Sequence, residues 1–109
     1  MKITFSPMRR DDRLVLHRDG DVLTINGEPF DFGPLPDGAT LPRTAIDCDW
    51  IAGPVERIEG MLHIPLILPH GAEAPMQTLF PDPMTLIADG AVDLPPHSTP
   101  EPETPYVED

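Results

Sequence analysis

The sequence is poor in cysteine, in aromatic residues and in long apolar runs. Its 109 residues include one cysteine, which excludes an internal disulfide. Apolar runs such as 66–68 are far too short to cross a bilayer, and residues 1–7 lack the long apolar stretch of a signal peptide. We therefore expect no membrane span and no secretion through a signal peptide. A chain of this length fits one domain with one core.

Basic residues are also scarce, and they are unevenly distributed. Seven Lys and Arg stand against 19 Asp and Glu, which gives a net charge of −12. Residues 1–18 carry a charge of +3 (five basic, two acidic), residues 19–57 carry −6 (two basic, eight acidic), and residues 58–109 carry −9 with no Lys or Arg. Because binding to a phosphate backbone needs a positively charged face, we expect no nucleic-acid partner.

Helices of ordinary length have almost no place in this chain. It contains 16 prolines and 8 glycines, and the longest window free of both is 8–19. Proline in a helix interior costs about 3 kcal/mol and glycine about 1 kcal/mol. The sequence therefore predicts a single all-β domain over residues 1–94. Antiparallel hairpins and a three-stranded meander would form a small sandwich or an open barrel.

The clearest feature that is present is the meander, over residues 13–32. Its strands are separated by Asp-Gly at 19–20 and by Asn-Gly at 26–27. These dipeptides are typical of type I′ hairpin turns, in which both central residues need positive φ. The turns place Leu16 opposite Leu23, and Leu23 opposite Phe30. One face of the meander is then apolar. It consists of Leu14, Leu16, Leu23, Ile25, Phe30 and Phe32.

Pro29 limits the pairing of the third strand of the meander. In the predicted register its nitrogen points away from the central strand, which is tolerated only if 28–32 is an edge strand or ends its pairing there. Ile3 and Phe5 alternate with polar residues, which predicts a further strand of the same sheet.

A second β unit is predicted after a proline-rich loop at 32–43, which we expect Leu35 and Leu41 to anchor. Strands at 45–52 and 55–58 lead through a Glu-Gly turn into a strand at 61–68, whose even-numbered residues form an apolar face. The turn places Arg57 opposite Leu62. Where Pro54 meets Pro65, regular pairing should stop or bulge.

The last part of the chain is predicted to hold a short hairpin and a tail. A loop at 68–83 leads to strands 84–88 and 91–94, which we expect to pair around Asp-Gly at 89–90. Residues 95–109 contain five prolines, four acids and few apolar side chains. This composition predicts a disordered acidic tail, because so little apolar surface cannot offset the entropy of ordering.

No group of residues predicts catalysis, a cofactor or a metal site. The four histidines show no zinc-like spacing with one another or with Cys48. A Gly-x-Ser-x-Gly elbow, a phosphate-binding glycine loop, a dinucleotide fingerprint and an EF-hand pattern are all missing. We therefore expect a protein that is not an enzyme and that uses no cofactor.

Three residues near these patterns have more than one interpretation. Cys48 lies between Asp47 and Asp49, whose charges would raise the pKa of the thiol, which is the wrong direction for a nucleophile; we expect a half-buried strand residue. Trp50 is either a core or sheet-face residue or an exposed interface anchor. His70 lies in a loop after a strand, where it is either part of a turn or a functional residue.

Four segments carry a resemblance to known proteins, namely 23–32, 35–39, 50–57 and 68–71. Their turns and aromatic residues resemble a group of small uncharacterised proteins encoded among phage and prophage tail genes of proteobacteria. The resemblance covers residues 1–94. It implies a small protein that belongs to the virion or assists its assembly, and therefore a cytoplasmic or virion-associated location.

Three functional hypotheses follow. The first is a non-catalytic phage or prophage tail-associated structural or assembly accessory protein that acts through contacts with other proteins, such as tail components. The second is a small-ligand or carbohydrate-binding β module, and the third is an enzyme that uses His70 and nearby carboxylates. The oligomeric state stays open. The candidate interaction surface consists of Trp50, His70, Pro29 and Phe80.

Overall fold

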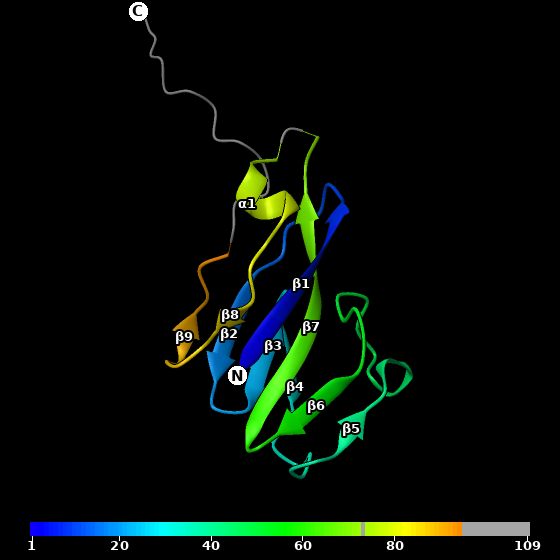
Figure 1. Ribbon diagram of the computed structural model, residues 1–109, viewed down its shortest axis with the longest axis vertical. Helices are drawn as coiled ribbons and strands as arrows, with labels where there is room; N and C mark the ends of the chain where they lie inside the picture. Colours follow the sequence, from blue (N-terminus) through cyan, green and yellow to red (C-terminus); the bar gives the residue numbers. More distant parts are fainter. Residues whose placement is uncertain (73, 95–109) are drawn as a thin grey trace, which may run out of the picture.

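The computed structural model describes residues 1–72 and 74–94, which form two β-sheets lying one over the other (Figure 1). The five-stranded sheet has the order β5-β6-β7-β1-β8, and the four-stranded sheet has the order β4-β3-β2-β9. The all-β prediction is therefore confirmed. The predicted tail at 95–109 lies outside the described residues. Among the described residues, no helix is long and apolar enough to cross a membrane.

The strands are short except for two. Those of the five-stranded sheet are β5 (Thr40–Leu41), β6 (Val55–Ile58), β7 (Met61–His70), β1 (Lys2–Arg9) and β8 (Met84–Thr85). Those of the four-stranded sheet are β4 (Glu28–Asp31), β3 (Val22–Ile25), β2 (Leu16–Asp19) and β9 (Gly90–Ala91). The described helical turns are η1 (Arg43–Ala45) and α1 (Met76–Leu79).

The core fills the space between the two sheets. The apolar face predicted for the meander is buried, with Leu16 and Leu23 at 1% exposure or less, and Phe30 packs against it half-buried. The even-numbered face of β7 is buried opposite. Alternation along each strand thus placed the apolar side chains of both sheets correctly, and the two inner faces make a small sandwich. The core residues from the five-stranded sheet are Ile3, Val55, Leu62, Ile64 and Leu66, and Met1 joins them from just before β1.

The β3–β4 hairpin of the meander forms as predicted, whereas the β2–β3 hairpin has a shifted turn. Asn26 and Gly27 have φ of 50° and 86°, and Leu23 lies opposite Phe30. The turn between β2 and β3, however, is centred on Gly20 and Asp21, so that Leu16 faces Ile25 instead of Leu23. A shift of the partner by two residues keeps every side chain on its predicted face, which is why the core is unaffected.

The second hairpin and the two proline-based predictions are confirmed. Arg57 faces Leu62 across a turn in which Glu59 and Gly60 have positive φ. The β6–β7 ladder stops before Pro65 and resumes with a shifted register at an isolated bridge between Ile51 and Leu66. β4, which contains Pro29, is an edge strand of its sheet. Proline thus ends or borders regular pairing at both places.

The prediction that Ile3 and Phe5 extend the meander sheet is wrong. Their strand, β1, runs parallel to β7 in the five-stranded sheet, with Ile3 opposite Ile64 and Phe5 opposite Leu66. The alternation of apolar residues identified a strand and its buried face. It gave no information about the partner strand, because parallel strands are joined by a long connection and not by a short turn that could be recognised in the sequence.

Two further predictions about pairing are wrong. The strands predicted at 84–88 and 91–94 do not pair with each other, because β8 pairs with β1 and β9 pairs with β2. The chain thus crosses between the sheets at 86–89. The predicted strand at 45–52 is instead a 3₁₀ turn, η1, followed by local turns, and only Ile51 bridges to β7. Short backbone bonds such as Cys48 N–H to Ile46 O (2.9 Å) replace a ladder there.

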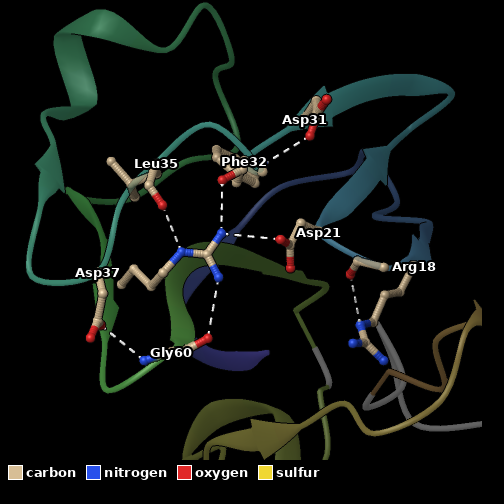
Figure 2. A network of polar contacts seen from close by, with 10 residues as sticks. Arg18, Asp21, Asp31, Phe32, Leu35, Asp37 and Gly60 are labelled. Atoms are coloured by element: carbon tan, nitrogen blue, oxygen red, sulfur yellow. Dashed lines mark hydrogen bonds and ion pairs between the residues drawn. The ribbon is translucent and has the colours of Figure 1, made fainter.

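A single guanidinium joins the loop at 32–43 to both sheets (Figure 2). Arg57 on β6 donates from Nε to Leu35 O (2.6 Å) and from Nη2 to Phe32 O (3.1 Å). The same Nη2 lies 3.1 Å from Asp21 Oδ2 in the β2–β3 turn, and Nη1 donates to Gly60 O (3.2 Å). The side chain is only 13% exposed. Arg57 therefore holds the crossing from β4 to β5 against the hairpin turns of both sheets.

Replacing Arg57 with Met should lower the free energy of unfolding by about 1–3 kcal/mol, because the carbonyls of Phe32 and Leu35 would lose a charged donor while partly buried. Urea denaturation followed by circular dichroism measures this. Arg13→Met is the matched control: Arg13 is exposed, so its loss should change stability by less than about 0.5 kcal/mol. Equal midpoints for the two variants would contradict the role given to Arg57.

Candidate functional site

Arg10 contacts Trp50 through its side chain and His70 through its backbone, at the carboxyl end of the parallel strands β1 and β7. The guanidinium of Arg10 lies 4.2 Å from the centre of the Trp50 ring and donates to Asp12 Oδ2 at 3.0 Å. The backbone N–H of Arg10 donates to His70 O (3.1 Å). A cation over an indole face is stabilised by the ring quadrupole, so Arg10 fixes the position of Trp50 beside this end of the sheet.

His70 ends β7 and is half-buried. Its Nδ1 lies 2.9 Å from the carbonyl oxygen of Gly71, which fits a proton on Nδ1 and a structural role in the turn. Its backbone carbonyl is occupied by Arg10. Of the two interpretations left open by the sequence, the contacts of His70 support the turn residue.

Trp50 also lines a polar cavity of about 270 Å³, which we call the Trp50 cavity. It lies where the β3–β4 turn of one sheet approaches the segment that follows η1. Pro29 itself does not line it, but its neighbour Glu28 does. The carbonyl of Trp50 accepts from Ile67 N–H (2.8 Å), which ties the cavity wall to β7. The full lining is Ile25, Asn26, Glu28, Asp47, Cys48, Asp49 and Trp50.

Cys48 in this wall is half-buried, as predicted, but in a turn instead of a strand. Burial raises the pKa of the Cys48 thiol, and the charges of Glu28 and Asp49 add to the rise, while backbone hydrogen bonds at Trp50 and Ile51 oppose it. The direction that the sequence predicted is therefore correct, although burial contributes more than the carboxylates. A thiol held in its protonated form is a poor nucleophile.

Phe80 lies apart from the other candidate residues, directly after α1. Its side chain is 72% exposed, as is that of Met76 on the same helical turn, and Leu79 is 36% exposed. The helical turn is closed by Phe80 N–H, which donates to Met76 O (2.9 Å). It packs on β7, and its residue Thr78 is fully buried. We call Met76, Leu79 and Phe80 the α1 patch.

Sequence reasoning missed two features of the surface. The first is Arg10, which lies in the basic segment 1–18 and covers Trp50; the contact depends on the parallel pairing that the sequence did not predict. The second is an apolar cavity in the loop at 32–43. The only sign of it in the sequence is the run Pro34-Leu35-Pro36, which places a leucine between two prolines. Within residues 1–72 and 74–94, no three His, Cys, Asp or Glu side chains lie close enough together to hold a metal ion.

Comparison with known proteins gives no relative on which to base an identification. No protein-family model matches the sequence, and neither a curated protein nor a solved structure was found to be similar to it.

In the folded protein, the reaction of the Cys48 thiol with iodoacetamide should require a higher pH than it does in urea, because folding raises the pKa of this thiol. The stability that the neutral thiol contributes is fully present below the ordinary thiol pKa and is lost as the pH rises through the folded pKa. Melting of wild type and Cys48→Ala at alkaline pH measures this loss, which should occur in wild type alone. Alkylation rates with the same pH dependence in both states would contradict it.

Proposed function

We propose that this protein is a non-catalytic accessory or structural component of a phage or prophage tail, and that it acts through contacts with other proteins. The α1 patch is the observation that supports it best. Three large apolar residues of α1 and its C-cap are exposed within five positions of the chain, and two of them are 72% exposed. Contiguous apolar side chains on a surface are typical of protein–protein interaction sites, since exposing them to water has no stabilising effect on the free protein.

The environment of the patch supports a docking element. Thr78 on the inner side of α1 is fully buried, so the helical turn is seated on the domain while its outer side chains face solvent. The choice of tail proteins as partners rests on the resemblance of residues 1–94 to small proteins encoded among tail genes. An apolar surface of this kind on a small acidic domain fits a larger assembly, in which burial of Met76 and Phe80 would contribute binding free energy.

Exchanging Met76 and Phe80 for Ser should reduce association with tail particles by about thirtyfold or more, because each of the two anchor residues contributes roughly 1 kcal/mol or more to an interface. The tagged protein is produced in a host in which the phage is induced, and its amount in density-gradient fractions that contain tails or tail intermediates is measured. Ile87→Ser is the matched control, since Ile87 is 89% exposed but lies outside α1. Absence of the wild type from every such fraction, or equal loss with Ile87→Ser, would contradict the proposal.

Binding of a small polar ligand is a second candidate function, favoured by the Trp50 cavity. An aromatic ring together with the carboxylates of Glu28, Asp47 and Asp49 can offer a stacking surface and hydrogen-bond acceptors to a monosaccharide. Arg10 already occupies one side of the ring, and the cavity is slightly smaller than the usual small-molecule site of about 300–1,000 Å³. These two facts make protein contact the better-supported function.

Trp50 is the single tryptophan of the chain, so its fluorescence reports on this cavity alone. If the cavity binds sugars, titration with hexoses and amino sugars should give a saturable change in emission that Asp49→Asn and Glu28→Gln weaken. If the protein acts only through protein contacts, the emission should stay constant up to high millimolar sugar. A saturable change that persists in Asp49→Asn and Glu28→Gln would contradict a role for the carboxylates.

A further inference from the structure

A second cavity opens on the side of the sandwich where the chain passes from β4 to β5. Its volume is about 210 Å³, and we call it the proline-loop cavity. Phe32 is almost fully buried there, and Leu35 and Leu41 are half-buried against the main core. The apolar lining is thus an outward continuation of the core. The lining residues are Asp31, Phe32, Pro34, Leu35, Pro36 and Leu41.

The walls of this cavity are fixed before any ligand arrives. Arg57 holds the carbonyls of Phe32 and Leu35, and Leu35 N–H donates to Phe32 O at 3.1 Å. Beyond the second proline, Gly38 N–H donates to Arg57 O at 2.7 Å, and Arg57 N–H donates to Ala39 O at 3.2 Å. The prolines also have a restricted φ. A binding partner therefore loses little free energy in ordering the loop.

The size of the cavity selects one side chain as its occupant. Small-molecule sites are usually about 300–1,000 Å³, whereas an apolar cavity of about 150 Å³ is known to take up benzene. At about 210 Å³ the proline-loop cavity accommodates a single aromatic ring and the first atoms of its attachment. Cavities of this kind are where the anchor residues of protein interfaces are buried.

The negative charge at the rim of the cavity determines which charged group can lie beside the bound ring. Asp31 Oδ1 accepts from Gly33 N–H at 2.8 Å, which leaves the second carboxylate oxygen at the exposed rim. Arg57, the cation that holds this loop, is paired with Asp21 at 3.1 Å. Residues 19–57 carry a net charge of −6. A cationic group next to the inserted ring is therefore attracted, and an anionic one is repelled.

We propose that the proline-loop cavity receives an aromatic side chain of a partner protein that carries Lys or Arg beside it. The chain's own Tyr106 does not fit this chemistry, because residues 95–109 hold four acids and no basic residue. The proposal rests on the proposed function in that it defines the chemistry of a protein partner. The cavity is nevertheless separate from the α1 patch, so each can be tested without the other.

Two small probes with the same ring and opposite charge test the proposal on the purified protein. Phenethylammonium and phenylacetate are titrated while the methyl NMR signals of Leu35, Leu41 and Ile87 are followed. Phenethylammonium should shift Leu35 and Leu41 in the millimolar range and bind about two- to fivefold more tightly than phenylacetate at low salt. The difference should shrink as salt is added. Ile87, which is 89% exposed, should not shift.

Asp31→Asn is the matched variant, because the amide oxygen can still accept the Gly33 N–H and keep the loop in place. It should discriminate less between the two probes than the wild type does, because one of the eight acids of residues 19–57 has been removed. Methyl signals of Leu35 and Leu41 that do not move with phenethylammonium, or a wild type that does not distinguish the two probes, would overturn the proposal. Loss of tail association in the α1 variant leaves this titration unchanged, so failure of the proposed function is distinguishable from failure here.

Discussion

The structure depends on how the loop at 32–43 is held as the chain passes from one sheet to the other. Its prolines lack N–H donors, so few bonds form within the loop, such as Leu35 N–H to Phe32 O (3.1 Å) and Ala39 N–H to Pro36 O (3.1 Å), and Leu35 O depends on a donor from outside the loop. The guanidinium of Arg57 supplies donors in a planar fork and reaches Phe32 O and Leu35 O together (Figure 2). Because the same group meets Asp21, the loop, β6 and the turn of the opposite sheet are fixed by one side chain.

The opposite crossing, between β8 and β9, is held in a related way. Asp89 Oδ1 accepts from Gly20 N–H at 2.9 Å and lies 3.8 Å from Arg18 Nη1. The β2–β3 turn is therefore bound from both sides of the sandwich, through Gly20 to one crossing and through Asp21 to the other. These contacts use the two central residues of the observed turn, and they favour its centre at 20–21 over the centre at 19–20 that the Asp-Gly dipeptide indicated.

The surface features follow from these crossings. The proline-loop cavity lies in the first crossing, whose backbone is already bonded and whose Leu35 and Leu41 pack half-buried against the core. The contact of Arg10 with Trp50 exists because β1 runs parallel to β7 and delivers Arg10 to the end where Trp50 lies. The Trp50 cavity lies between the β3–β4 turn and the segment 47–50. Of the residues selected from the sequence, Trp50 and His70 each contact Arg10, and Pro29 follows Glu28 of the Trp50 cavity. Phe80 lies apart from them, after α1.

The sequence by itself determined what local rules control. Alternation decided which faces of β2, β3 and β7 are buried, Asn26-Gly27 and Glu59-Gly60 decided two turns, and the prolines excluded long helices and ended ladders. Only the tertiary structure decided which strands pair, because β1 with β7 and β9 with β2 meet across long connections that leave no local signal. The same holds for the cavities, whose walls come from segments that are far apart in the sequence and adjacent only after folding.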